Sequence, residues 1–182
     1  MMMSALKMGG MEIITDRIRT ADINNPKGYY EFERVKKLPK GDVVWLESAQ
    51  GKAVKIISAL LRYLPQVHKY RVIFMERDIE EILASQERML ERSGKINESP
   101  NRNEVLKASF SEHLLEIKAW MKAQNWIDIY YVSYNQILQN PGVEFTKISK
   151  FLDEQVDPEA MAEVVDPKLY REQNLEKGKK FE

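Results

Sequence analysis

The chain has 182 residues, 43% hydrophobic and 31% charged, a balance typical of one globular domain with a substantial core. Basic and acidic residues both number 28, and the net charge of +0 argues against binding nucleic acid through overall charge. The absence of cysteine excludes disulfides, thiolate catalysis and zinc–thiolate sites. No apolar run approaches the roughly 18–20 residues that cross a bilayer, and the first residues do not form a secretory signal. We therefore expect a cytoplasmic protein without a membrane partner.

The N-terminal third predicts short elements separated by turns. Residues 1–8 are expected to form a helix that stops at Gly9-Gly10, a common helix end. The segment 22–28 contains Asn-Pro and Lys-Gly, which favour turns, and a short helix is expected at 31–37.

The remaining residues alternate between apolar strand-like runs and amphipathic helical segments. We expect strands at 53–57, 72–75 and 127–132, and helices at 59–64, from 79 onward, across 106–121, at 136–138 and at 145–152. A polar loop is expected at 93–102. Strands alternating with helices predict an α/β fold of three layers, in which helices flank a mostly parallel sheet. One domain is expected over residues 1–172, followed by a charged tail at 173–182.

The most informative segment is the strand that runs into Arg77. Arginine at the carboxyl end of a parallel strand is where open α/β sheets hold anionic ligands, and a guanidinium matches the geometry of phosphate. Ser85 follows eight residues later, near the margin of the apolar face of the next helix. The pair therefore indicates half of a nucleotide site. A glycine-rich phosphate loop of the kinase type is not found in the 182 residues, which argues against a nucleotide kinase.

Five segments in this order resemble the sulfotransferase family, specifically its shorter bacterial members. The segments that carry the resemblance are Arg77-Asp78 with Ser85, Asn25-Pro26-Lys27-Gly28-Tyr29-Tyr30-Glu31, Val54-Lys55-Ile56-Ile57 leading to Leu64-Pro65, Tyr131-Val132-Ser133-Tyr134 before Leu138-Gln139-Asn140-Pro141, and Asp166-Pro167-Lys168-Leu169-Tyr170-Arg171. The resemblance implies a P-loop-type α/β fold. It also implies transfer of a sulfuryl group from 3′-phosphoadenosine 5′-phosphosulfate (PAPS) to a hydroxyl or amine.

The resemblance assigns roles to four residues. Arg77 and Ser85 match the pair that binds the 3′-phosphate, and Lys55 matches a lysine beside the transferring sulfate, where an ammonium stabilises charge. Many animal members place a histidine just after that lysine, but this chain has none there. Glu31 is our candidate for the base, as other branches use a glutamate. No metal is implied, the acceptor is not identified, and a homo-oligomer is an open expectation.

The N-terminus departs from the family pattern. Members begin with a strand and a loop that cradles the 5′-phosphosulfate, whereas residues 1–6 resemble the helix that follows this loop. The first, central strand of the sheet is then also missing, leaving a slot with hydrophobic neighbours. Either translation starts upstream of Met1, and the preceding DNA encodes the strand and loop in frame, or the protein is a truncated, non-catalytic remnant or interaction protein. These residues alone are expected to be inactive.

Simpler interpretations of the same residues stay open. Arg77 can instead pair with Asp78 or Glu81 as an ordinary salt bridge, and Lys55 can be an exposed lysine at a strand edge. Glu31 can be a first-turn carboxylate that complements the helix dipole. His113 lies on the apolar face of its helix and is expected to be packed. Two histidines far apart in the sequence give little support for a metal site.

Overall fold

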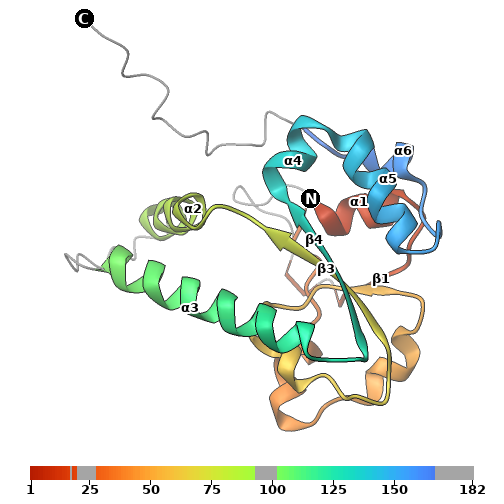
Figure 1. Cartoon of the computed structure of the whole chain (residues 1–182), viewed down its shortest axis with the longest axis horizontal. Helices are drawn as coiled ribbons and strands as arrows, with labels where there is room; N and C mark the ends of the chain where they lie inside the picture. Colours follow the sequence, from red (N-terminus) through yellow and green to blue (C-terminus); the bar gives the residue numbers. More distant parts are fainter. Residues whose placement is uncertain (17, 20–27, 93–101, 167–182) are drawn as a thin grey trace, which may run out of the picture.

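A computed structural model of the chain describes residues 1–16, 18–19, 28–92 and 102–166 (Figure 1). Most of the expected loop at 22–28, nearly all of the expected loop at 93–102, and the tail at 173–182 lie outside these residues. None of the helices in the described ranges is long and apolar enough to cross a membrane.

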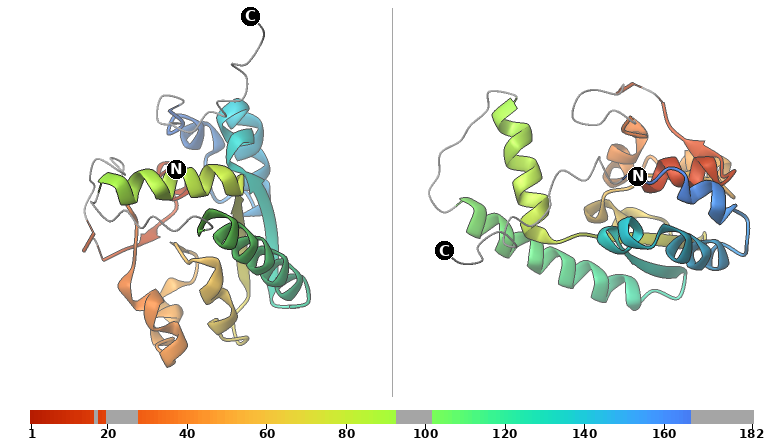
Figure 2. Two further views of the ribbon diagram at one scale, coloured as in Figure 1. Left: turned by 90° about the vertical axis from the view of Figure 1, so that its left-hand side faces the viewer. Right: turned by 90° about the horizontal axis from the view of Figure 1, so that it is seen from above.

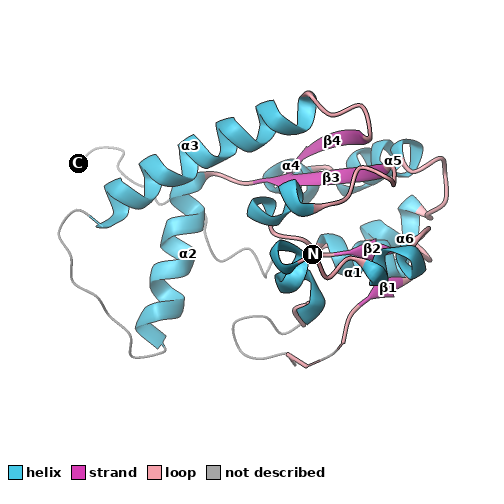
Figure 3. Cartoon of the chain, turned by 90° about the horizontal axis from the view of Figure 1, so that it is seen from below, coloured by secondary structure: helices cyan, strands magenta, loops and turns pink. Residues whose placement is uncertain are grey.

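Four strands form two parallel pairs. β1 (Ile13–Ile14) pairs with β2 (Ala53–Val54), and β3 (Tyr70–Glu76) pairs with β4 (Ile127–Ser133). Figure 3 shows β2 and β3 as the inner strands, one from each pair. Parallel pairing confirms the expected sheet type and the α/β class. The expected slot left by a central strand stays a prediction.

Nine helical elements surround the strands in the described part of the chain. They are α1 (Met2–Met8), the 3₁₀ helices η1 (Glu33–Lys40), η2 (Val44–Ala49) and η3 (Ser58–Tyr63), then α2 (Ile79–Arg92), α3 (Arg102–Lys122), α4 (Tyr134–Gln139), α5 (Pro141–Phe151) and α6 (Pro158–Ala162). The expected helices at 1–8, after 79 and across 106–121 are confirmed. The sequence patterns did not reveal η2 or α6.

Helices cover both faces of the strands, as a three-layer fold requires (Figures 1 and 2). Along β3, Val72 and Phe74 pack with α3 and η1–η3, whereas Ile73 and Met75 pack with α1 and α4–α6. This alternation follows from the two-residue period of a strand, which points successive side chains to opposite faces. A strand with two buried faces reads as a continuous apolar run, which is why β3 was recognisable in the sequence.

Two expected elements differ from the structure for identifiable reasons. The strand expected at 53–57 contains only β2, because its partner β1 ends at Ile14 and the chain there turns away to contact the segment before η1. The helix expected at 31–37 is the 3₁₀ helix η1, which begins at Glu33, contains Pro39 and ends at Lys40, just before Gly41. Proline removes a backbone donor, and Gly41 has a φ of 80°, the left-handed conformation that ends helices.

Candidate functional site

The structure brings together the two residues expected to act in catalysis. Lys55 directly follows β2, and its Nζ lies 3.8 Å from Oε1 of Glu31. The same Nζ donates a hydrogen bond of 3.1 Å to the carbonyl oxygen of Tyr29. The side chains are 39% and 24% exposed respectively, so the pair remains open to solvent and to a ligand.

Glu31 is held at the carboxyl end of β1 through its backbone. The hydroxyl of Thr15 donates to the carbonyl oxygen of Glu31 at 2.9 Å, and the backbone N–H of Asp16 reaches the same oxygen at 3.3 Å. One carboxylate oxygen of Asp16 accepts from the backbone N–H of Glu33 at 2.6 Å. The backbone N–H groups of Glu33 and, to a smaller extent, Ile18 donate to this carboxylate and lower the pKa of Asp16 below its ordinary value.

The turn that carries Glu31 uses uncommon backbone conformations. Gly28 has a φ of 84°, and Tyr30, which directly precedes Glu31, has a φ of 52°. A tyrosine with positive φ is rare and is retained only where its surroundings impose it. Arg19 completes this group: its Nη1 lies 3.2 Å from Oε1 of Glu31, and its guanidinium lies 3.4 Å from the centre of the buried ring of Tyr29. Glu31 therefore accepts a hydrogen bond from Arg19 and forms a longer ion pair with Lys55.

Arg77 directly follows β3 and contacts residues from two elements. Its Nε donates to Oε2 of Glu81 at 2.9 Å, and its guanidinium lies 4.9 Å from the centre of the Tyr134 ring. Tyr134 begins α4 directly after β4, the strand beside β3. Burial raises the pKa of Tyr134 above its ordinary value, while the nearby charge of Arg77 opposes this shift and that of Glu81 adds to it.

The ion pair with Glu81 is one of the simpler interpretations of Arg77, and the structure contains it. Its presence does not decide against a ligand, because a guanidinium has five N–H donors and this contact uses Nε. The side chain of Arg77 is 24% exposed. Ser85 lies two helical turns further along α2 and is half-buried. Arg77 thus lies just before α2 and Ser85 lies on it, at the end of the other strand pair.

Local sequence explains why Arg77 lies at this point. The carboxylate of Asp78 accepts from the backbone N–H of Glu80 at 2.7 Å, which is the geometry of a residue that caps the first turn of a helix. On the neighbouring strand, Ser133 caps α4 in the same way, accepting from Gln136. β3 and β4 end at matching positions, since Glu76 is opposite Ser133 in the parallel register.

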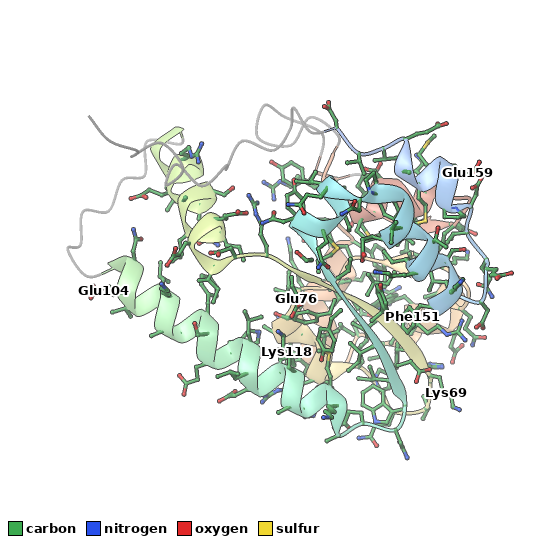
Figure 4. The ribbon with its side chains drawn as sticks, turned by 45° about the horizontal axis from the view of Figure 1, so that its top comes forward. Lys69, Glu76, Glu104, Lys118, Phe151 and Glu159 are labelled. Carbon is green, nitrogen blue, oxygen red and sulfur yellow. The ribbon has the colours of Figure 1, made fainter. Side chains whose placement is uncertain are left out.

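Two further polar contacts near the strand ends come from α3. Lys118 forms an ion pair with Glu76, the last residue of β3, and Figure 4 shows the two labelled side chains together. Nε2 of His113 lies 2.8 Å from Oγ of Ser58, three residues after Lys55. His113 is half-buried, as expected for a histidine on an apolar face, but its hydroxyl partner was not foreseen.

Sequence reasoning identified the ends of the strands but not the residues that complete each site. Arg19, Tyr134 and Asn135 were missed as partners. Glu81 was named as a possible partner of Arg77, and an acid four residues after an arginine has the spacing of a helical ion pair. No comparable signal exists for Asn135, which belongs to another element. In the described ranges, no three histidine, aspartate or glutamate side chains gather as metal ligands do.

Comparison with known proteins yields one finding. The family model described as sulfotransferase domain matches residues 31–173, which is most of the chain and includes Glu31, Lys55, Arg77 and Ser85. No curated protein and no solved structure matches the chain.

Proposed function

Because the chain belongs to the sulfotransferase domain family, we propose that it transfers a sulfuryl group from PAPS to a hydroxyl or amine acceptor. The observation that carries this proposal is the position of Arg77, directly after β3, beside the ring of Tyr134 and held by Glu81. Parallel α/β folds bind their ligands at the carboxyl ends of strands, and arginine is suited to a phosphate there.

In this proposal Arg77 and Ser85 hold the 3′-phosphate of the nucleotide. The guanidinium supplies charge and several donors, and the serine hydroxyl supplies one more. The double charge of a phosphate monoester makes such contacts strong in a partly desolvated site. PAPS supplies the activated sulfuryl group, and the chain supplies the groups that bind it and handle the proton.

Glu31 and Lys55 act on the acceptor and on the developing charge. The acceptor oxygen or nitrogen forms a bond to sulfur while the bond from sulfur to the 5′-phosphate oxygen breaks. The carboxylate of Glu31 takes the acceptor's proton, and the ammonium of Lys55 stabilises negative charge on the transferring group. The 3.8 Å between their charged atoms is short enough for both to contact one reacting centre.

The 3′-phosphate half of the proposal is tested by binding. Isothermal titration with adenosine 3′,5′-bisphosphate and with adenosine 5′-monophosphate measures how much the 3′-phosphate contributes. We expect the bisphosphate to bind at least about a hundredfold more tightly, and Arg77→Ala to remove most of this difference, since charge-assisted contacts to a dianion are lost.

Arg71→Ala is the matched control for this experiment. Arg71 lies on β3 as well, but it pairs with Asp153 away from the strand end, so its removal changes the same charge without touching the proposed site. An equal affinity of the wild-type chain for both nucleotides, or an unchanged preference in Arg77→Ala, contradicts the proposal. The first result favours the competing function, a non-catalytic scaffold that keeps the fold.

The catalytic half is tested with Glu31→Gln and Lys55→Met, introduced into a form of the protein that also carries the family's upstream strand and 5′-phosphosulfate loop. Release of adenosine 3′,5′-bisphosphate from PAPS is followed with a panel of phenols, alcohols and amines. Loss of a general base lowers rates by about 10²–10⁴, so Glu31→Gln is expected to lower kcat by this factor while nucleotide affinity is kept. A Glu31→Gln enzyme with an unchanged kcat rules out Glu31 as the base.

A further inference from the structure

Glu81 lies between the two residues proposed to bind the 3′-phosphate. It follows Arg77 by four residues and precedes Ser85 by four, a spacing that places side chains on one face of a helix. Its side chain is only 4% exposed. Buried carboxylates are rare unless they are paired, because removing them from water is costly. A buried acid beside a site for an anion therefore needs an explanation.

The two oxygens of Glu81 accept from two different elements. Oε2 accepts from Nε of Arg77 at 2.9 Å, and Oε1 accepts from Nδ2 of Asn135 at 3.3 Å. Asn135 is in α4, next to Tyr134, whose ring lies beside the guanidinium. The carboxylate thus joins the start of the helix after β3 to the start of the helix after β4.

We propose that Glu81 is a positioning residue for Arg77. It holds Nε against α2 and the Tyr134 ring, which directs the terminal nitrogen atoms of the guanidinium toward a phosphate monoester. A free arginine side chain has many rotamers, and fixing one before the ligand arrives reduces the entropy lost on binding. The inference rests on the proposed function, since the phosphate in question is the 3′-phosphate.

Positioning and charge make opposite predictions for substitutions at Glu81. Removing the carboxylate makes the site more positive, so an effect through charge alone strengthens phosphate binding. Loss of positioning weakens it. Glu81→Gln keeps an acceptor at the same distance without the charge, whereas Glu81→Asp keeps the charge on a side chain that is one methylene shorter and does not reach Nε.

The test measures the preference for adenosine 3′,5′-bisphosphate over adenosine 5′-monophosphate in each variant. We expect Glu81→Ala and Glu81→Asp to lower this ratio by about tenfold or more, and Glu81→Gln to keep it within about threefold. A defect of the fold lowers the affinity for both nucleotides and leaves their ratio unchanged, so the ratio separates positioning from structural damage.

The structure indicates that Glu81→Gln folds. Oδ1 of Asn135 is buried and has no hydrogen-bond partner among the described residues. When the Asn135 amide rotates by 180°, its oxygen accepts from the side-chain NH₂ of the glutamine in Glu81→Gln. The side-chain oxygen of that glutamine still accepts from Nε of Arg77, so the hydrogen bonds to Arg77 and to Asn135 are both kept. If Glu81→Ala does not fold, the nucleotide preference of Glu81→Gln compared with that of Glu81→Asp still tests whether Glu81 positions Arg77.

Glu80→Ala is the matched control. Glu80 is the adjacent acid on α2, is 66% exposed and pairs with Lys107, so its removal changes the net charge equally without touching Arg77. A wild-type chain without a 3′-phosphate preference defeats the proposed function itself. A wild-type preference that persists in Glu81→Ala and Glu81→Asp, or that increases in them, overturns only the role of Glu81.

Discussion

The strength of the Glu31–Lys55 pair decides whether Glu31 is available to take a proton. We consider the single variants Glu31→Gln and Lys55→Met and the double variant. Each single variant removes one charge with little change in volume, so the double-mutant cycle isolates the interaction between the two groups.

The structure bounds the expected coupling energy. At 3.8 Å between Nζ and Oε1, Coulomb's law gives about 1 kcal/mol in bulk water and about 4 kcal/mol at an effective dielectric constant of 20. Exposed fractions of 39% and 24% put the pair near the aqueous limit, and Arg19 shares the carboxylate at 3.2 Å. Exposed ion pairs contribute about 0.2–1 kcal/mol in measured cycles. We therefore expect a coupling of about 0.5 kcal/mol.

Urea denaturation of the four proteins at pH 7 measures this coupling, in low salt and in 1 M NaCl. Screening at high salt is expected to remove most of it, since the Debye length falls to about 3 Å. The surface pair Lys52–Glu12 supplies a control cycle. A coupling above about 2 kcal/mol that does not respond to salt refutes the reasoning. Glu31 is then locked in a dry ion pair, and a substrate must break it.

Three further predictions concern stability. Burial raises the pKa of Tyr70 to about 12, so its contribution to stability is complete below pH 10 and is lost as the pH rises toward 12. Urea denaturation should give a free energy of unfolding about 1 kcal/mol lower at pH 11 than at pH 9, and an equally large fall in Tyr70→Phe contradicts this. Ser58→Ala and His113→Ala should each lower the free energy of unfolding by about 1 kcal/mol, and the double variant should lose no more than either single variant, because both remove the same hydrogen bond. If the losses of the two single variants add up fully in the double variant, this hydrogen bond does not contribute to stability. Phe145→Ala should cost about 3–5 kcal/mol in the same assay, because its side chain is fully buried; a loss under 1 kcal/mol is inconsistent with this packing.

The elements recognised from the sequence are those whose pattern is local. β3 is an apolar run ended by a capping aspartate, and α2 and α3 have helical periodicity. The 3₁₀ helices η1 and η3 were expected only as helices of no stated type, and η2 was missed, because short segments of this kind contain too few residues to show a period. The strand expected at 53–57 was also too long, since a strand ends where its partner ends, and the partner β1 has only two residues.

The amino-acid sequence by itself determined the α/β class, the family and the position of Arg77 at a strand end, because each of these follows from residues close together in the chain. Only the tertiary structure decided which side chains meet. Glu31 meets Lys55, His113 meets Ser58 across 55 residues, and Asn135 meets Glu81 across 54. Such contacts depend on how parallel strands bring distant segments to one edge, and no local pattern encodes that geometry.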